Sequence, residues 1–238
     1  MKTIPIVFDK NLLDNGIKHY HRINLQKYPH ILSIGGTGSG KTYLNKIIIG
    51  KIVLRIPNSQ ITVLDFKGED YNFADKSNRL YRFENCKQGL EDFYNDFKEL
   101  QKGTITSRKL KFLVVEELGS MLSFYSRKET EEVKSLIANL ILMGRSFNIH
   151  CLISTQRPDS KLFSSGVRDN FSSILALGNL SKEGKSMLFK DFEDRIDPVY
   201  SQGAGYLLMN NSDFYKIQVP EVTNKRKLEE AIILGLTR

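Results

Sequence analysis

Short, almost continuous apolar runs alternate along the chain with longer stretches in which apolar residues recur every three or four positions. The first pattern is typical of strands that are buried on both faces of a parallel sheet, and the second of helices that cover such a sheet. We therefore predict an α/β fold with a mostly parallel central sheet flanked by helices. The predicted strands are residues 30–34, 60–65, 111–116, 149–155 and 173–177.

Helices fit between the predicted strands. The clearest is residues 128–144, where the apolar residues from Val133 to Ile141 recur at helical spacing. Ser181 and Asn224 are suitable N-caps for two other helices, because their side chains can accept a hydrogen bond from a free backbone amide. The predicted helices are 42–55, 88–100, 128–144, 182–189 and a terminal helix after residue 224.

The C-terminal part of the chain has a different pattern. Two apolar runs, residues 205–209 and 214–219, are separated by the polar residues 210–213. This predicts a C-terminal antiparallel hairpin, which we expect at the edge of the sheet. No Pro- or Ser-rich linker divides the chain, so we expect an N-terminal lead-in, residues 1–28, followed by a single domain, residues 29–238.

Composition narrows the class of protein. The chain has 238 residues, of which 40% are apolar and 26% are charged, which argues against disorder and allows a substantial core. No run approaches the roughly 18 apolar residues of a membrane span, and the first ten residues do not resemble a signal peptide. The two cysteines, Cys86 and Cys151, lack a metal-ligand spacing. We therefore expect a cytoplasmic protein without a membrane segment of its own.

The charge balance favours an anionic partner. The 35 Lys and Arg residues against 27 Asp and Glu residues give a formal net charge of +8. Because Lys and Arg release counterions when they approach phosphates, this excess suits binding to nucleic acid. A solvated basic surface without such a partner would have the same charge, so composition alone leaves both interpretations open.

A glycine-rich sequence follows the first predicted strand. It matches G-x-x-x-x-G-K-[ST] in full and precedes a helix, which is the arrangement of a phosphate-binding loop. Glycines let successive backbone amides point at an anion, Lys41 would reach the β- and γ-phosphates, and the Thr42 hydroxyl would bind Mg²⁺. We therefore expect the chain to bind ATP and Mg²⁺. The predicted phosphate-binding residues are Gly35, Gly36, Thr37, Gly38, Ser39, Gly40, Lys41 and Thr42.

Two carboxylates, Glu116 and Glu117, stand at the end of the predicted strand 111–116. In a P-loop ATPase the first acidic residue at this place holds Mg²⁺ through water, and the second polarises the attacking water. The first is usually Asp, whereas Glu116 is one methylene longer. We expect Glu116 to bind the metal together with Thr42, and Glu117 to act as the general base.

Several segments together resemble the FtsK/SpoIIIE–HerA superfamily of DNA-pumping ATPases, and in particular the small FtsK-like proteins of conjugative and other mobile elements of Gram-positive bacteria. The resemblance extends from about residue 29 to residue 219 and implies a RecA-like P-loop NTPase fold. The most diagnostic of these segments is GRSFNIHCLISTQRP. The others include PHILSIGGTGSGKT, VLDFKGED, FLVVEELGSML and GAGYLL.

The resemblance implies roles for residues outside the two motifs. Gln156 matches the family's sensor, whose amide would contact the γ-phosphate or the attacking water. Arg145 is the first candidate for an arginine that acts on the neighbouring subunit's nucleotide, with Arg168 and Arg157 as competing candidates. Residues 65–68, Asp-Phe-Lys-Gly, match an Asp-x-Lys segment that would brace the active site or face the subunit boundary.

An arginine that acts in trans requires assembly, and the resemblance implies a hexameric ring with DNA in its central pore. Segments 120–130 and 157–168 are the predicted pore loops, and the basic run 225–227 is a further candidate contact. The phosphate contacts expected in these loops are Arg127, Lys128 and Lys161. FtsK-type motors usually carry membrane-spanning segments, and this chain has none, so we expect any recruitment to a membrane to depend on a partner.

Several functions fit these features. The first is an ATP-driven DNA translocase that serves transfer, replication or segregation of a mobile element, with the strandedness of the DNA left open. A virus-type genome-packaging ATPase has the same motor core. A nucleotide or small-molecule kinase fits less well, because no Arg-rich lid is visible and Glu117 favours activation of water. A non-hydrolysing ATP-dependent scaffold is the remaining alternative.

Overall fold

Ten strands form one mixed sheet in the computed structural model, which describes residues 3–159, 162–163 and 165–238. The strands lie in the order β2-β1-β10-β9-β8-β3-β7-β6-β4-β5. All five strands predicted from the buried apolar runs are present, which confirms the α/β class. They are β3 (His30–Gly35), β4 (Gln60–Asp65), β6 (Lys111–Glu116), β7 (Ile149–Thr155) and β8 (Ser173–Leu177).

The parallel half of the sheet contains these five strands and one more, β5 (Leu80–Arg82). Each neighbouring pair from β8 to β5 is parallel. β5 was not predicted, because three residues are too few to show a periodicity. Since all these strands point the same way, their carboxyl ends meet at one edge of the sheet, where ligands of α/β proteins bind.

The antiparallel half contains the predicted hairpin, β9 (Ala204–Met209) and β10 (Asp213–Gln218). Its turn has two successive residues in the left-handed region, Asn210 and Asn211, and asparagine tolerates that conformation well. The expectation that the hairpin forms the edge of the sheet was wrong. Two strands of the N-terminal segment lie beyond it, so that β10 pairs with β1 (Ile4–Asp9) and the edge strand is β2 (Tyr20–Ile23).

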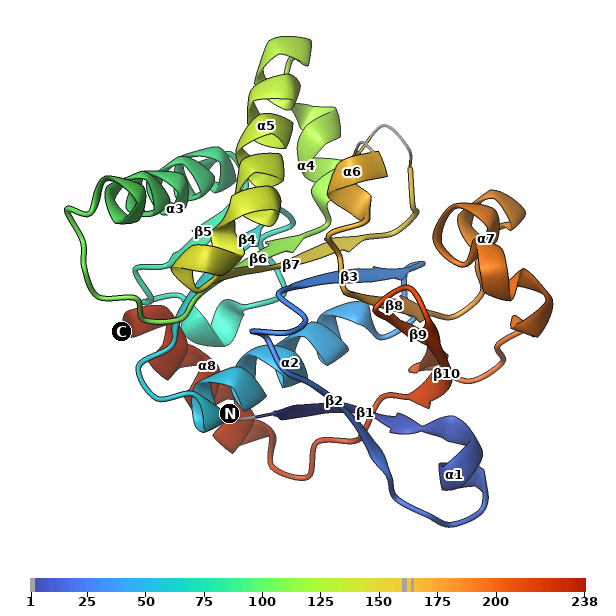
Figure 1. Ribbon diagram of the computed structural model, residues 1–238. Coiled ribbons are helices and arrows are strands. Elements are labelled where there is room, and N and C mark those ends of the chain that lie inside the picture. Colours follow the sequence, from blue (N-terminus) through green and yellow to red (C-terminus); the bar gives the residue numbers. More distant parts are fainter. Residues whose placement is uncertain (1–2, 160–161, 164) are drawn as a thin grey trace.

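Helices cover both faces of the sheet (Figure 1). On one face lie α2 (Lys41–Arg55) and α8 (Lys225–Thr237); on the other lie α3 (Asn85–Lys102), α4 (Leu118–Phe124) and α5 (Arg127–Met143). The remaining helices are short: α1 (Lys10–Asp14), α6 (Ser165–Arg168), α7 (Lys182–Leu188), η1 (Asn72–Ala74), η2 (Gly144–Phe147) and η3 (Lys190–Arg195).

Capping side chains fix where several helices begin. Ser181 accepts a hydrogen bond from the Gly184 amide and Asn224 accepts one from the Lys227 amide, as predicted. At α5, Ser126 and Glu129 form a reciprocal capping box, which satisfies two otherwise free backbone groups.

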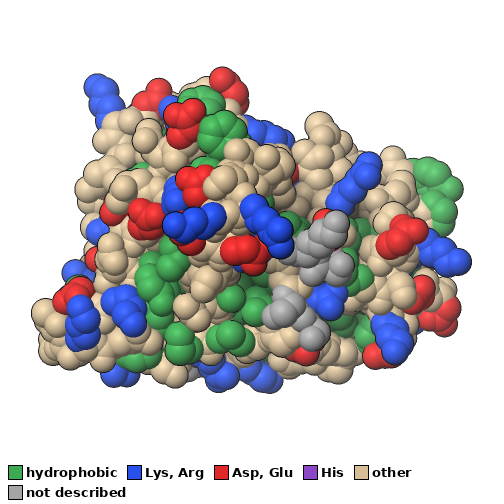
Figure 2. Space-filling view, turned by 90° about the horizontal axis from the view of Figure 1, so that it is seen from above, with side chains coloured by type: hydrophobic (Ala, Val, Ile, Leu, Met, Phe, Trp, Pro, Cys, Tyr) green, Lys and Arg blue, Asp and Glu red, His purple; other side chains and the backbone are tan. Residues whose placement is uncertain are grey.

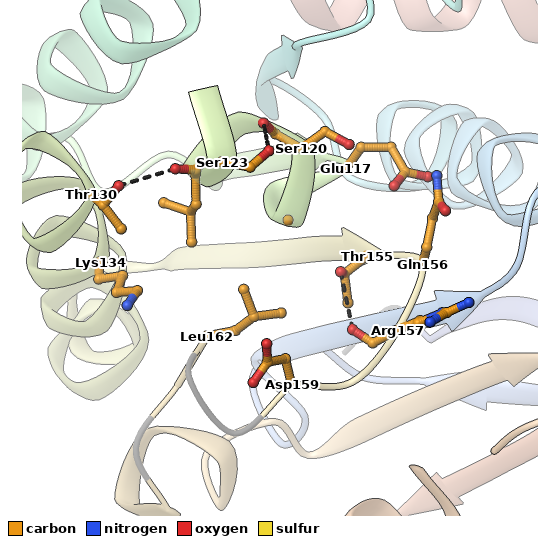
Figure 3. A pocket seen from close by; sticks show the side chains of 12 residues that line it. Glu117, Ser120, Ser123, Thr130, Lys134, Thr155, Gln156, Arg157, Asp159 and Leu162 are labelled. Atoms are coloured by element: carbon orange, nitrogen blue, oxygen red, sulfur yellow. Dashed lines mark hydrogen bonds between the residues drawn. The ribbon is translucent and has the colours of Figure 1, made fainter. Parts of the chain in front are cut away.

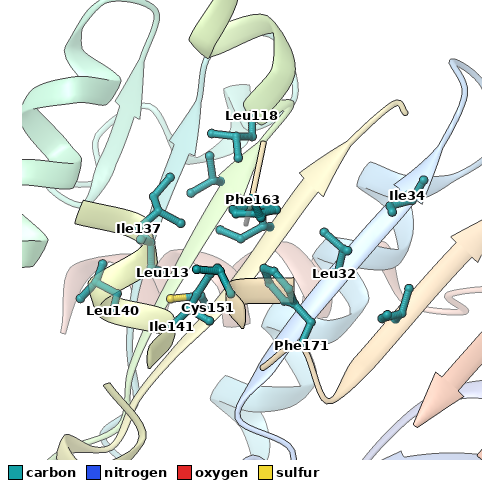
Figure 4. Close-up of a cluster of buried hydrophobic side chains, with 14 of the residues drawn as sticks. Leu32, Ile34, Leu113, Leu118, Ile137, Leu140, Ile141, Cys151, Phe163 and Phe171 are labelled. Carbon is teal, nitrogen blue, oxygen red and sulfur yellow. The ribbon is translucent and has the colours of Figure 1, made fainter. Parts of the chain in front are cut away.

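Two hydrophobic cores lie on opposite sides of the sheet, because successive side chains of a strand point to opposite faces. In β6, Leu113 belongs to the core beneath α3–α5, whereas its neighbour Phe112 belongs to the core beneath α2 and α8. Figure 4 shows the first core, where Ile137 and Leu140 of α5 pack towards the strands. Together the two cores hold the sheet between its helices and fix the edge that carries the site.

Candidate active site

The phosphate-binding loop connects β3 to α2, as the motif predicts. Gly38 and Gly40 adopt φ values of 79° and 98°, a region that side chains disfavour. The Lys41 ammonium donates a 2.6 Å hydrogen bond to the Gly35 carbonyl, so the side chain folds back over the loop. Because α2 begins at Lys41, the positive end of its dipole faces the space above this loop.

A segment near the C-terminus supports the loop from the side. The side-chain amide of Gln202 donates a 2.8 Å hydrogen bond to the Gly38 carbonyl, and the Gly203 amide donates a 3.1 Å bond to the Ser39 carbonyl. The GAGYLL motif, whose first residue is Gly203, belongs to the resemblance found in the sequence. Its role in bracing the phosphate-binding loop was not predicted, because it depends on contacts more than 160 positions apart.

Lys41 and Glu117, the two central residues of the predicted chemistry, lie in contact. Their side chains form an ion pair with an Nζ–Oε1 distance of 3.1 Å, and both are about 95% buried. Glu117 follows β6 in the left-handed conformation, with φ 55° and ψ 54°. Such a conformation is uncommon for a residue other than glycine and is found preferentially at functional sites. It turns the second carboxylate of the Glu-Glu pair towards the phosphate-binding loop.

A second lysine reaches the same carboxylate. The ammonium group of Lys67, in the connection after β4, lies 3.5 Å from the Glu117 Oε1 atom. The connection is fixed by Asp65, whose side chain accepts hydrogen bonds from the amides of Gly68 and Asp70. The structure therefore brings the Asp-x-Lys segment to the active site.

Glu116, the other carboxylate, points into the interior and is held by two residues that sequence reasoning missed. The Asn45 amide donates to both carboxylate oxygens at 3.1 and 3.0 Å, and the Tyr71 hydroxyl donates at 2.8 Å. Burial raises the pKa of Glu116 to about 7, although the hydrogen bonds from Asn45 and Tyr71 oppose the shift. Asn45 lies one turn after Lys41 on α2, so a search for polar residues on that helical face could have found it.

A magnesium site would need the nucleotide to complete it. No three His, Cys, Asp or Glu side chains in the part of the chain that the structure describes come together as a metal site. Mg²⁺ in nucleotide enzymes is commonly held by one or two protein ligands together with phosphate oxygens and water. A carboxylate has about four lone-pair positions, and Asn45 and Tyr71 use three of those on Glu116. The donor set is thus compatible with water-mediated binding.

A cavity of about 420 Å³ opens beside Glu117, between α4, α5 and the carboxyl end of β7. Figure 3 shows Glu117 and Gln156 at one end of this cavity, with their side chains pointing towards one another, and Lys134 at the other end. Gln156 directly follows β7. The predicted sensor therefore lies beside the predicted base. The cavity is lined by Glu117, Gly119, Ser120, Leu122, Ser123, Thr130, Lys134, Thr155, Gln156, Arg157, Asp159 and Leu162.

The three candidate arginines lie in different places. Arg145 lies in η2, which precedes β7, and therefore at the amino ends of the parallel strands. Because the phosphate-binding loop follows the carboxyl end of β3, Arg145 lies at the opposite edge of the sheet from the site in its own chain. Arg157 lines the cavity beside Glu117, and Arg168 ends α6.

The predicted pore loops are only partly loops. Segment 120–130 is mostly helical, because α4 ends at Phe124 and α5 begins at Arg127, so this expectation was wrong. Buried Leu118, Met121 and Leu122 anchor α4, and the capping box at Ser126 starts α5 at once. In segment 157–168 the last four residues form α6, and Lys161 lies outside the described residues.

The face that carries α4 and α5 has a mixed charge. Figure 2 looks down on it from above Figure 1 and shows Lys and Arg side chains interspersed with Asp and Glu. Lys134 and Lys87, for example, pair with carboxylates of Glu131, Glu129 and Glu132. The excess positive charge of the chain is therefore not gathered into one basic surface on this face.

Comparison with known proteins places these features in a family. The model of the Helicase HerA central domain matches residues 12–195. The FtsK-domain-containing protein YdcQ of Bacillus subtilis is 27% identical over 244 residues, a match that covers 93% of this chain and 50% of YdcQ. The DNA translocase FtsK of Listeria monocytogenes is 25% identical over 185 residues, which covers 64% of this chain and 24% of that protein.

A solved structure supports the fold. The monomer form of the pCW3 conjugation coupling protein TcpA with ATPγS superposes with a TM-score of 0.71 at 16% identity, over 92% of this chain and 65% of that one. The chain spans about half the length of YdcQ and about a quarter of FtsK. Among the described residues, no helix is long and apolar enough to cross a membrane. The chain belongs to the Helicase HerA central domain family and has the RecA-like fold of the FtsK/HerA-type P-loop ATPases.

Proposed function

We propose that this chain is the motor domain of a DNA translocase that hydrolyses ATP. The observation that carries the proposal is the buried contact of Lys41 with Glu117 at the phosphate-binding loop. Both side chains lie at the carboxyl edge of the sheet, where Lys41 would bind the phosphates and Glu117 would activate water. The membership in a family that includes DNA translocases, such as the FtsK of Listeria monocytogenes, supports the motor function.

Each residue of the site has a distinct part in the proposed hydrolysis. The amides of residues 35–42 and the Lys41 ammonium would bind the phosphates, and Thr42 and Glu116 would hold Mg²⁺, which would supply positive charge beside the transferring group. Glu117 orients the attacking water and accepts its proton. Gln156, which lies beside Glu117, contacts the γ-phosphate or this water. It would thereby sense when the γ-phosphate has been hydrolysed.

We further propose that the site is completed by a neighbouring copy in a ring, which in this family is expected to be a hexamer. Arg145 lies at the other edge of the sheet from the phosphate-binding loop of its own chain, which supports a role towards the nucleotide of a neighbouring copy. The guanidinium would stabilise negative charge on the γ-phosphate in the transition state. DNA would pass through the centre of this ring, held by phosphate contacts that do not depend on sequence.

The biological setting is the least constrained part of the proposal. We propose cytoplasmic action on the DNA of a mobile element, in transfer, replication or segregation, with recruitment to a membrane only through a partner. Genome packaging requires the same motor core, so the choice between the two depends on the proteins encoded beside this one.

The test is the rate of phosphate release with and without DNA. We expect single-stranded DNA, double-stranded DNA or both to increase the rate of phosphate release. The increase should be smaller at higher salt concentration, because contacts with DNA phosphates weaken as salt is added. Heparin, a polyanion without bases, serves as the control for charge alone. A rate of ATP hydrolysis that is the same with and without DNA would contradict a DNA motor. Transfer of phosphate to a labelled small acceptor would indicate a kinase instead.

A further inference from the structure

The connection after β4 holds Lys67 in a defined place. Besides the two hydrogen bonds that Asp65 accepts, the ring of Phe83 lies against Gly68, which has a φ of 76°. A Cβ atom at this position would come within 2.1 Å of the ring, so only glycine fits. The backbone on both sides of Lys67 is therefore fixed, although 42% of the Lys67 side chain is exposed.

The same connection also packs against α4, the helix that directly follows Glu117. The ring of Phe66 lies 5.4 Å from that of Phe124 and 6.3 Å from that of Tyr125, at the end of α4. Such aromatic contacts are favourable beyond the apolar area that they bury. Lys67 is thus attached to the element that carries the catalytic carboxylate, independently of its own ion pair.

The Lys41 ammonium group can contact either its protein partners or the phosphates of a bound nucleotide. In the structure its ammonium group contacts both the Gly35 carbonyl and Glu117. A bound nucleotide offers it phosphate oxygens with a larger negative charge. As Lys41 turns to the phosphates, Glu117 loses the nearer of its two cations, and the ammonium group of Lys67, at 3.5 Å, is the one that remains. A buried carboxylate left without a partner is costly, so this second lysine has a use in the ATP-bound state.

We propose that Lys67 is a positioning residue for Glu117: its ammonium group, 3.5 Å from Oε1, holds the carboxylate in place and aimed at the attacking water once ATP has drawn Lys41 away. This inference rests on the proposed hydrolysis of ATP. Lys67 acts through Glu117 and does not contact the nucleotide, so it affects the chemical step and leaves ATP binding unchanged.

Steady-state hydrolysis by the full chain tests this with Lys67→Met, Lys67→Arg and a matched control. We expect Lys67→Met to lower kcat about tenfold, less than the roughly 10²- to 10³-fold loss for a group that acts directly on the reacting atoms, because Lys67 acts through Glu117, with KM for ATP within about twofold of wild type. Lys67→Arg should restore most of kcat. Lys76→Met, which removes an exposed lysine from the same connection between β4 and β5, should match wild type.

A Glu117→Gln background separates action through Glu117 from other effects. There Lys67→Met should leave the residual rate unchanged, because the carboxylate on which it acts is gone. A rise in KM with unchanged kcat would show that Lys67 binds phosphate and would overturn the inference. Equal kcat in Lys67→Met and wild type would overturn it as well and leave the proposed function intact. Wild-type protein without any ATP turnover would overturn both.

Discussion

Titratable groups are buried at both edges of the parallel sheet, but in different forms. At the amino ends of β3 and β7, His30 and His150 are about 99% buried. Burial lowers the pKa of His30 to about 3 and that of His150 to about 4, so both are neutral at pH 7. At the carboxyl edge, Lys41 and Glu117 are buried as an ion pair.

The two edges differ because a neutral side chain and a charged side chain have different free-energy costs of burial. A neutral imidazole needs no opposite charge: His150 Nδ1 lies 3.1 Å from the Pro29 carbonyl oxygen, and His30 accepts a hydrogen bond from the Cys151 amide. A buried charge is several kcal/mol more costly and needs an opposite charge in close contact. Such an arrangement adds little to stability, so an ion pair in which both partners are buried is a sign of function. At the amino edge the buried Lys111 also has an ionic partner, but that partner, Asp96, is 37% exposed.

Removal of the charge at the carboxyl edge should have the largest effect. In Lys41→Ala the phosphates lose their cation, and we expect kcat/KM for ATP to fall at least about a hundredfold. Nucleotide binding measured with a fluorescent ATP analogue should weaken in parallel. Lys51→Ala, near the other end of the same helix, should stay within about twofold. An equal loss in both variants would erase the contrast between the two edges.

The two neutral histidines should make the free energy of unfolding depend on pH. Between about pH 6.5 and 4 these two histidines bind protons in the unfolded chain but stay neutral in the folded chain. The free energy of unfolding therefore falls as pH falls. The slope reaches about 1.4 kcal/mol per pH unit for each histidine. Urea unfolding at several pH values measures it. His30→Asn keeps an acceptor but has no titration, so its slope should be shallower; an unchanged slope would contradict the burial of a neutral imidazole.

Glu116, the interior carboxylate at the carboxyl edge, should affect the pH dependence of stability in the opposite direction. Because the pKa of Glu116 is raised to about 7, the folded chain binds more protons than the unfolded chain between about pH 4.5 and 7, and this group lowers stability as pH rises. Tyr71→Phe removes a hydrogen bond to it, and we expect a loss of about 1–3 kcal/mol that is larger at pH 8 than at pH 5. Tyr125→Phe, which loses only a 3.5 Å contact, should lose less than about 0.5 kcal/mol.

Local sequence patterns predicted the five longer parallel strands and the phosphate-binding loop, because both depend on residues that are neighbours in the chain. The strand β1 was missed since Pro5 interrupts a short run, and its place inside the sheet depends on pairing with β10, some 200 residues away. The helix α4 was missed because a single left-handed residue, Glu117, starts it directly after β6.

Within the site, sequence motifs indicated Lys41, Glu117 and Gln156 but not what holds them. The contacts of Glu116 with Asn45 and Tyr71 join positions 71 and 45 residues apart, and that of Lys67 with Glu117 joins positions 50 apart. No local pattern encodes such pairs. The chemistry could be read from motifs, whereas the arrangement that tunes it depends on tertiary structure.

The most direct test of the central claim is ATP binding and single-turnover hydrolysis by Glu117→Gln. The amide keeps the size of the side chain but cannot accept a proton from water, so we predict ATP binding close to wild type and hydrolysis slowed about 10²- to 10⁴-fold. Glu230→Gln, an exposed substitution on α8, should hydrolyse ATP normally. Hydrolysis by Glu117→Gln at the wild-type rate would contradict the assignment of Glu117 as the catalytic base.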